Sequence, residues 1–385
     1  MERDGPLAGV TVVDLSRVLA GPYATLLLAD LGARVIKVER PESGDDARGI
    51  GPFVAGRSAY FASVNRGKQS VALDLGDPED RALFEKLLAR ADVLAENFRP
   101  GALERLGYGW ETLHARWPRL ILASTSGFGQ TGPLAARPAY DLVVQAMGGI
   151  MSLTGQPGGP PTRVGTSIGD LAAGLFTALG VVAALHERTR TGQGCHVDVA
   201  MLDCQVALLE NAFARHAATG EVPGPLGSRH PSIAPFQAYA ARDGYLVIAA
   251  GNDGLFRRLC ERVGRPELAR DSRFASNEAR TRHVEALQVE LEAALAGGDV
   301  ATWLTRFEAE GIPCGPIRNV AQVAADPQVA ARRMLVEIEH APGATLRVPG
   351  NPIKSEGIPD PERRPGAPEL DADRARLRAW LDEGE

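Results

Sequence analysis

The sequence predicts an α/β protein with two domains, a larger one built on a parallel sheet and a smaller α+β one. Short β-type apolar runs alternate with helical stretches over the first half of the chain. The stretch 222–226 is rich in proline and glycine and has the composition of a linker. Beyond it the pattern changes to a hairpin followed by helices. We therefore expect a large domain over 1–224, a small domain over 225–325, and a C-terminal segment, 326–385, that returns to the large domain.

The large domain begins with a βαβ unit, the start of a parallel sheet with helices on its faces. Val10 to Leu15 is the first strand, Pro22 to Leu31 the helix, and Arg34 to Glu39 the second strand. The connection before the helix contains only one glycine, Gly21, so the glycine fingerprint of dinucleotide-binding folds is absent. The domain is therefore expected to be Rossmann-like without binding NAD. This connection is either a plain turn or a place where the helix N-terminus receives a phosphate.

The alternation continues along the large domain, and a different set of elements follows the linker. In the large domain we expect strands at 70–75, ending at 95, at 120–126 and at 195–201, and helices at 78–90, 110–116, 171–188 and 202–218. In the small domain we expect a hairpin from 236–240 and 245–250, helices at 254–263, 281–296 and 300–310, and a strand at 312–316.

Composition excludes several classes of protein. The 385 residues are 44 % hydrophobic and 23 % charged, the balance of a globular protein, and the net charge of −6 comes without a long basic stretch. Binding to nucleic acid or to a membrane surface is therefore not expected. The N-terminus lacks an apolar targeting segment and no apolar run is long and uninterrupted enough to span a bilayer, so we expect a cytoplasmic protein. Its four cysteines lack metal-ligand spacing, which predicts reduced thiols and no metal site.

The most informative stretch is 164–170, which ends in Gly169 and Asp170 before a long apolar helix. The unpaired N–H groups of a first helical turn hold a carboxylate ionised. Glycine before it lets a ligand or a second backbone approach closely. An ionised, approachable aspartate can act as a nucleophile. It can equally be an ordinary helix cap, and spacing alone favours the cap.

Other polar residues allow two interpretations each. Arg40 and Arg105 lie near the expected carboxyl edge of the sheet, where arginines can neutralise phosphates, although single surface arginines are mostly just solvated. Tyr140 and Asp141 precede a helix and can form a cap with an aromatic contact. His230 lies in a loop without a partner histidine, which favours a structural role over metal binding.

Taken together, the motifs resemble the class III CoA-transferase family, the CaiB/BaiF type that includes formyl-CoA transferase and carnitine CoA-transferase. The resemblance spans nearly the whole chain. It is carried by the segments 15–22, 28–33, 35–39, 65–70, 96–107, 126–130 and 311–316. The resemblance implies a homodimer whose two chains are interlocked, with acyl-CoA and a small carboxylic acid as substrates and no tightly bound cofactor.

In this family the aspartate before the long helix is the nucleophile, which here is Asp170. The resemblance implies that its carboxylate attacks an acyl-CoA thioester, passes through a mixed anhydride and an aspartyl-CoA thioester, and delivers CoA to an acceptor acid. It further implies the residues that bind CoA, from its nucleotide end to its thiol: Val18, Leu19, Arg40, Leu73, Asp74, Asn97, Phe98, Arg105, Tyr140 and Asp141. Leu19 replaces a glutamine of formyl-CoA transferase, which argues against a formyl/oxalyl substrate pair.

Two other functions remain as alternatives. The same fold includes α-methylacyl-CoA racemases, which need two acid/base groups, but Tyr140 stands where they have a histidine and is a poor base near neutral pH. A non-catalytic CoA-binding protein would be expected to lack Asp170. Among transferases, the segment 226–237 resembles the branch that acts on succinate and related dicarboxylates. Gly169 and, within this segment, Arg229 and His230 are candidate substrate contacts, and Arg229 could pair with a distal carboxylate.

Overall fold

The computed structural model describes residues 4–383, which form two compact units. The large unit holds the chain through Met151, Arg163–Val222, and the chain from Pro327 onwards. The small unit holds Pro223–Asp326 and, in addition, Ser152–Thr162. This short excursion of the chain into the small unit has no counterpart in the expected domain boundaries.

A six-stranded parallel sheet forms the centre of the large unit, and the expected α/β fold class is confirmed. The order of its strands is β5-β2-β1-β6-β7-β8, with every neighbouring pair parallel. The strands are β1 Thr11–Asp14, β2 Arg34–Glu39, β5 Gln69–Ala72, β6 Val93–Glu96, β7 Ile121–Ser126 and β8 His196–Ala200.

Helices cover both faces of this sheet, because successive side chains of each strand point to opposite sides. Val13 and Leu94 pack into a core with α3 (Pro78–Ala89), α5 (Trp110–Arg116) and α17 (Arg374–Asp382). Val12 and Val93 pack on the other side against α1 (Ala20–Asp30) and α8 (Ile168–Thr191). The C-terminal helix is thus part of the main core.

The remaining elements of the large unit frame the sheet. They include the hairpin β3 Phe53–Val54 and β4 Arg57–Ser58, α2 Ala59–Asn65, α4 Ala102–Arg105, α6 Asp141–Met147, α9 Met201–Leu208, α10 Glu210–Thr219, α16 Pro327–Ala331, and a second sheet of β12 Leu335–Ala341, β13 Ala344–Pro349 and β14 Arg363–Arg364. The short helix α7, Ile150–Leu153, lies where the chain passes into the small unit. The single helix expected over 202–218 is divided in two at Leu209, whose ψ of 28° leaves the helical range.

The small unit is built on an antiparallel sheet of three strands in the order β11-β10-β9. Its hydrophobic core lies between this sheet and the helices, and includes Tyr239, Phe256 and Leu291. The strands are β9 Phe236–Ala241, β10 Gly244–Ala249 and β11 Cys314–Pro316, and the helices are α11 Asp253–Arg262, α12 Asn277–Arg282, α13 Val284–Leu295, α14 Val300–Glu308 and α15 Val320–Ala324.

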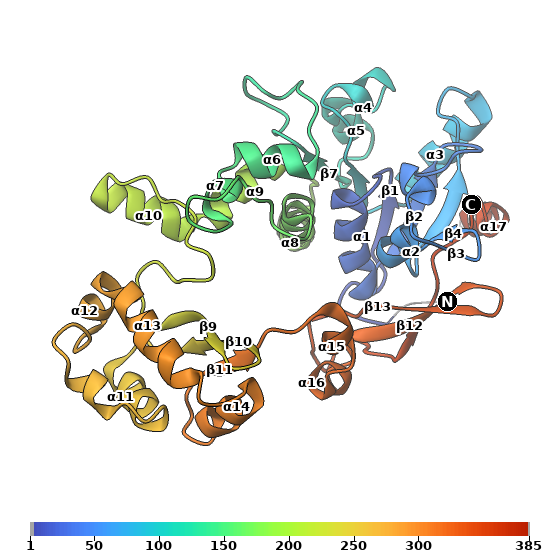
Figure 1. Cartoon of the computed structure of the whole chain (residues 1–385). Helices are drawn as coiled ribbons and strands as arrows, with labels where there is room; N and C mark the ends of the chain where they lie inside the picture. The colour runs from blue at the N-terminus through green and yellow to red at the C-terminus, as the bar shows by residue number, and fades with distance from the viewer. Residues whose placement is uncertain (1–3, 384–385) are drawn as a thin grey trace. The chain divides into compact units, whose positions relative to one another are not determined.

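The long helix α8 packs closely along α1 (Figure 1). A Cβ atom at Gly174 would lie 2.7 Å from the Ala20 carbonyl oxygen and 2.9 Å from the Tyr23 ring. No side chain fits there, so glycine at this position sets the spacing of the two helices. The starts of α1 and α8 thereby lie side by side, and both reach the same end of the sheet.

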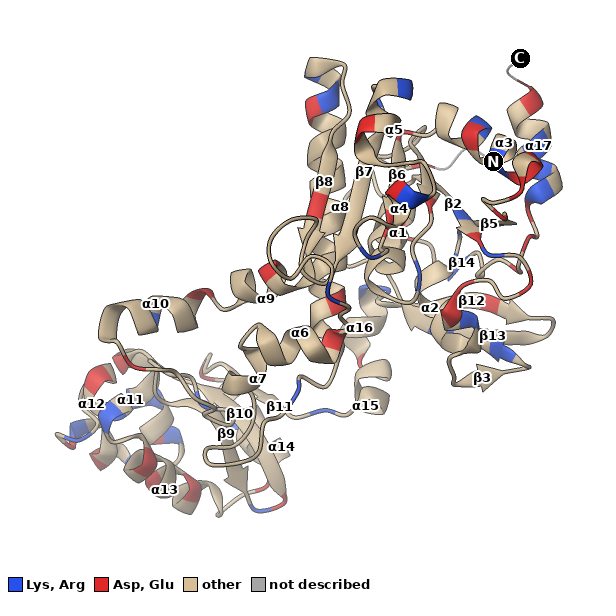
Figure 2. Cartoon of the chain, turned by 90° about the horizontal axis from the view of Figure 1, so that it is seen from above, with Lys and Arg blue, Asp and Glu red and all other residues tan. Residues whose placement is uncertain are grey.

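Among residues 4–383, α8 alone is long and apolar enough, by length and composition, to cross a membrane. The expectation that no apolar run reaches such a length is therefore wrong. After Asp170 the next charged residue is Glu187, and the charges of α8 gather near its C-terminal end (Figure 2). Its inner side, with Ala178 and Val181, packs in the core of the large unit.

Candidate functional site

The strand order reverses between β1 and β6, and two turns meet there. From β1 the chain proceeds to β2 and β5, then crosses to β6 on the other side of β1. Ligands of open parallel sheets bind at such a switch point, beyond the carboxyl ends of the strands. Asn97, just after β6, holds the turn after β1. Its Oδ1 accepts the Arg17 N–H at 2.8 Å, and its Nδ2 donates to the Arg17 carbonyl oxygen at 2.8 Å.

The turn after β1 contains a strained residue, Val18, with φ of 66°. A β-branched residue rarely adopts this left-handed conformation, and such strain persists only where neighbours enforce it. The Val18 N–H donates to Asp45 Oδ1 at 3.0 Å. Together with the Asn97 clamp, this bond fixes the turn that leads into α1.

Buried ion pairs stabilise this turn. Lys37 Nζ lies 2.8 Å from Asp45 Oδ2 and donates to the Ser16 carbonyl oxygen at 2.7 Å. Lys68 Nζ lies 3.0 Å from Asp14 Oδ2. Burial opposes ionisation of Asp14, but the ammonium groups of Lys68 and Lys37 prevail and lower its pKa to about 2. The turn therefore rests on charges that would be costly to leave unpaired.

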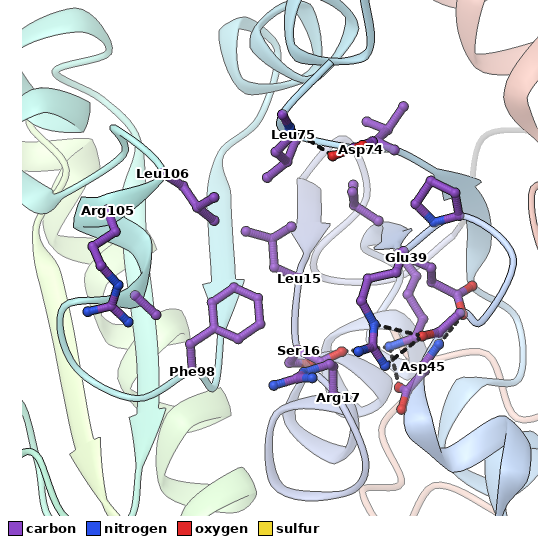
Figure 3. A pocket seen from close by; sticks show the side chains of 18 residues that line it. Leu15, Ser16, Arg17, Glu39, Asp45, Asp74, Leu75, Phe98, Arg105 and Leu106 are labelled. Carbon is purple, nitrogen blue, oxygen red and sulfur yellow. Dashed lines mark hydrogen bonds and ion pairs between the residues drawn. The ribbon is translucent and has the colours of Figure 1, made fainter. Parts of the chain in front are cut away.

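A cavity of about 430 Å³ opens at the switch point. In Figure 3 the side chains of Leu15, Leu75, Phe98 and Leu106 surround one space, into which they reach from different elements. These side chains form an apolar part of the wall. Charged residues of both signs line the rest: Arg17, Lys37, Glu39, Arg40, Asp45, Asp74 and Arg105. Five residues expected to bind CoA line it: Arg40, Leu73, Asp74, Phe98 and Arg105.

A second cavity, of about 240 Å³, is lined by the starts of α1 and α8. Arg17 and Phe98 line both cavities, and the Arg17 guanidinium lies over the Phe98 ring, 5.3 Å from its centroid. These two side chains form a wall shared by the two cavities. The other expected residues found in the second cavity are Val18, Leu19, Asn97, Tyr140 and Asp170.

Asp170 is the third residue of α8, since the helix begins at Ile168, and Ser167 stands at the N-cap position. Its carboxylate has no hydrogen-bond partner among residues 4–383, so the interpretation as a helix cap, which spacing favoured, is wrong. Burial raises its pKa to about 7, and the nearby charge of Asp141 adds to the effect. Desolvation and the like charge of Asp141 thus oppose the ionisation that the helix start was expected to favour.

Gly169 allows a carboxylate to approach the start of α8. Its N–H donates to Asp141 Oδ1 at 2.8 Å, and Asp141 Oδ2 accepts from Gln145 Nε2 at 2.7 Å. A Cβ at Gly169 would lie 2.8 Å from Val144 Cγ2 and 3.0 Å from Asp141 Oδ1. The close neighbours of this glycine are thus residues of α6. Asp141, expected to border the CoA thiol, is buried here and anchors the backbone next to Asp170.

Sequence reasoning missed several residues near Asp170. Tyr60, from α2, has its pKa raised to about 12 by burial and by the charges of Asp170, Asp45 and Asp141. Arg99 and Arg137 line the second cavity. Tyr60 stands in a segment that was assigned to no element, so its position could not be foreseen. Tyr140, in contrast, was foreseen at the cavity, and it is 76 % exposed.

Arg229 and His230 belong to the small unit. The His230 ring lies 5.3 Å from that of Phe236, and its Nδ1 accepts the Ser232 N–H at 3.1 Å. These contacts hold a loop in shape. Their part in substrate binding stays a prediction.

The chemistry of the cavities suits an extended anionic ligand with an apolar section. Arg17, Arg40 and Arg105 can neutralise phosphates, and the leucines of the first cavity can cover a ring. Asp170 can supply a carboxylate in the second cavity. Within residues 4–383, no group of three histidine, cysteine or acidic side chains is arranged to hold a metal ion.

Comparisons with known proteins agree on one family. The family model "CoA-transferase family III" matches residues 7–374. The acetyl-CoA:oxalate CoA-transferase of Acetobacter aceti is 51 % identical over 97 % of this chain and 95 % of its own length. The succinate–glutarate CoA-transferase of Agrobacterium fabrum is 41 % identical over 99 % and 96 %. A crystal structure of a CAIB/BAIF family protein from Brucella suis superposes with a TM-score of 0.87 at 42 % identity, covering 99 % of this chain and all of the other.

Proposed function

The chain belongs to CoA-transferase family III, and we propose that Asp170 is the carboxylate that carries the acyl and CoA groups through its reaction. The expected class III CoA-transferase is thereby confirmed, in preference to a racemase or a non-catalytic protein. The observation that supports Asp170 is its place. It is an unpaired carboxylate in a cavity that shares a wall with a larger, arginine-lined one.

We infer that acyl-CoA spans both cavities. Its nucleotide end occupies the first, where apolar side chains cover the ring and arginines meet the phosphates. The pantetheine arm passes the wall made by Arg17 and Phe98. The thioester then reaches Asp170 in the second cavity. This path passes every expected CoA-binding residue except Asp141, which holds the start of α8 instead. It places Val18 and Leu19 near the thioester in the second cavity, whereas the resemblance implied the nucleotide end for them.

The reaction follows from the chemistry of a carboxylate nucleophile. Asp170 attacks the thioester carbonyl, the C–S bond breaks, and a mixed anhydride and CoA thiolate result. The thiolate attacks the aspartyl carbonyl, which releases the donor acid and leaves an aspartyl-CoA thioester. The acceptor carboxylate attacks this thioester to give a new anhydride and thiolate. The thiolate then attacks the acceptor carbonyl, which yields the new acyl-CoA and restores Asp170.

We propose dicarboxylates as acceptors. Two relatives carry names that pair CoA transfer with oxalate or with succinate and glutarate. Arg17, Arg99 and Arg137 line the cavity of Asp170 and could pair with the carboxylate that does not react. A dicarboxylate needs such a partner because its second charge would otherwise be desolvated without compensation.

The experiment that tests Asp170 uses succinyl-CoA and acceptors labelled with ¹⁸O in the carboxylate, namely oxalate, glutarate and acetate. In the proposed reaction one labelled oxygen passes from the acceptor to Asp170, and mass spectrometry of the digested protein detects it there. A CoA adduct on the same peptide is expected when acceptor is withheld. D170N should lower transfer by at least about 10⁴-fold, since the reaction loses its nucleophile.

The matched control is D203N. Asp203 is likewise the third residue of its helix, α9, but it is exposed and lines neither cavity. Its replacement should leave transfer unchanged. Full exchange by D170N, or label that bypasses Asp170 while transfer proceeds, would rule out the proposed covalent route.

We also propose that the protein is a homodimer. The outer side of α8 carries four apolar side chains that remain exposed on the single chain: Leu175, Phe176, Leu179 and Val182. Contiguous exposed apolar surface of this kind is typical of a contact face. A second copy of the chain is the occupant that the family resemblance implies.

A further inference from the structure

Glu96 is a buried carboxyl group that the proposed reaction does not use. It ends β6, immediately before Asn97 and Phe98, and only 5 % of it is exposed. Its Oε2 accepts the Phe98 N–H at 2.6 Å. A short bond from a backbone N–H to a carboxylate is among the stronger hydrogen bonds in proteins. Glu96 therefore fixes the direction in which the chain leaves the strand.

Glu96 is also the end of a side-chain relay across three strands. The Ser124 hydroxyl, opposite on β7, is hydrogen-bonded to the Glu96 carboxyl group. His196 Nε2, on β8, lies 2.9 Å from Ser124 Oγ. The charged groups that face Glu96 are Glu104 from α4 and Asp198 from β8. Burial, and then these two like charges, raise the pKa of Glu96 to about 7, although the bonds from Ser124 and Phe98 oppose the shift.

The turn that Glu96 holds carries the wall between the two cavities. Phe98 lines both cavities beneath the Arg17 guanidinium. Asn97, between Glu96 and Phe98, makes both bonds to the Arg17 backbone. If the Phe98 backbone moves, the wall and the clamp on the turn after β1 move with it.

We propose that Glu96 is a positioning residue for acyl-CoA: through the Phe98 backbone it sets the wall of Arg17 and Phe98 that the pantetheine arm must pass. This rests on the proposed function, which places the arm there. Glu96 touches no reacting atom. It acts on substrate binding, whereas Asp170 acts on bond exchange.

The relay makes this role detectable, because the direction of its hydrogen bonds depends on whether Glu96 is protonated. When Glu96 is ionised, Ser124 donates to it and His196 donates from Nε2. When Glu96 is protonated, it donates to Ser124, whose hydroxyl then donates to His196 Nε2, so the imidazole proton resides on Nδ1. Burial lowers the pKa of His196, which favours the neutral ring. The imidazole tautomer thus reports the state of Glu96.

The test compares E96A and E96Q with wild type, using CoA binding by calorimetry and KM and kcat for succinyl-CoA. In E96A the Phe98 N–H loses its acceptor, so the Kd for CoA and the KM should rise about tenfold with a smaller change in kcat. In E96Q the amide oxygen can still accept this N–H, so binding should return to within about twofold of wild type. E104Q is the control, since it removes a neighbouring carboxylate without touching Phe98, and it should bind CoA as wild type does.

¹⁵N NMR of His196 gives the second readout. The wild-type ring should change from the Nδ1–H to the Nε2–H tautomer as pH rises through about 7, and E96Q should keep Nδ1–H throughout. Wild-type Kd and KM in E96A, or a tautomer that ignores E96Q, would overturn the inference. Because CoA binding needs no transfer, a protein that binds CoA but transfers nothing would contradict the Asp170 mechanism while leaving this inference intact.

Discussion

Two carboxyl groups next to each other in space have different tasks at the start of α8. Asp141 is buried, and its oxygens accept from the Gly169 N–H and from Gln145. Asp170 lies in the cavity without such bonds, and its pKa is raised to about 7. Hydrogen bonds to one carboxylate and their absence at the other separate the two roles, as acids and bases are separated in other active sites.

The pH dependence of transfer should follow from Asp170. Only the ionised carboxylate is a nucleophile, so kcat/KM should rise with pH and level off above about 7. At pH 6 only about one-tenth of the groups are ionised, which predicts a roughly tenfold lower rate. Steady-state rates from pH 5 to 9 check this. A flat profile down to pH 5 would contradict the raised pKa.

D141N is the informative partner variant. Its amide oxygen can still accept the Gly169 N–H, but the charge that helps to raise the pKa of Asp170 is gone. The midpoint of the pH profile should therefore move to lower pH, while the maximal rate changes less.

The stability of the protein should also depend on pH through Asp170, but in the opposite direction from the transfer rate. The pKa of Asp170 in the folded protein lies above its ordinary value of 3.8, so the folded state binds this proton more tightly than the unfolded state. The contribution is present in full below about pH 4 and is lost as pH rises through about 7. The free energy of unfolding of wild type relative to D170N should fall over that interval.

At the residue scale, the sequence indicated which residues lie at the cavity better than it indicated their burial and their neighbours. Asp170 and its surroundings Val18, Leu19, Asn97 and Tyr140 were indicated by motifs that are contiguous in the chain. Tyr60 and Glu96 escaped notice because their significance lies in burial and in neighbours far away in sequence. A raised pKa depends on desolvation, which a single sequence does not display.

The contact between α1 and α8 sets the geometry of the cavity at the scale of elements. Their first turns carry Leu19 and Ala20 on one side and Asp170 on the other. G174A should push the helices apart, because its methyl group would meet the Ala20 carbonyl oxygen at 2.7 Å. We expect a loss of about 1–3 kcal/mol in stability and at least a tenfold fall in kcat/KM. Thermal unfolding and steady-state kinetics measure the two effects.

G180A provides the comparison within the same helix. A Cβ at Gly180 would lie 2.7 Å from Val197 Cγ1 and would meet no backbone atom of α1, so only the Val197 side chain must shift. Alanine also favours the helix by about 1 kcal/mol over glycine. G180A should therefore lose some stability through Val197 but keep its kcat/KM, because Gly180 lines neither cavity. Equal losses in both variants would show that α1 contact is not the reason Gly174 matters.

Elements with strong local patterns were predicted well, and weakly patterned ones were not. The six strands of the large sheet and the helices α3, α5 and α14 lie at or within a few residues of their expected places. The strands β12 and β13 and the short helices α4 and α16 were missed, since their stability comes from tertiary packing more than from propensity. Val336, Ile338 and Val348, for example, pack on Ala62 of α2, hundreds of residues away in sequence.

Self-association is the prediction at the scale of the whole molecule. The outer face of α8, with Leu179 64 % exposed, should be covered in a homodimer. Light scattering should give about twice the chain mass of 40.8 kDa, and an interlocked dimer should keep this mass on dilution until it unfolds. L179E should lower the yield of dimer or prevent folding, since it would bury an unpaired charge.

V289E is the matched control for surface charge. Val289, on α13, is exposed to a similar degree, 68 %, but belongs to the small unit. Its change should leave the mass unaltered. A wild-type mass close to that of one chain at micromolar concentration would contradict the homodimer.

The order of the elements along the chain also affects how the protein folds during translation. The first strands of the large sheet leave the ribosome early, yet Leu377 and Leu381 of α17 complete the core that these strands share. The entire small unit is synthesised in between. The large unit must therefore wait, with part of its core uncovered, until α17 has been synthesised, whereas the small unit can close earlier, while the chain is still growing. A stop codon a few residues before α17 would leave every residue named at the switch point in place and still yield a polypeptide that depends on chaperones.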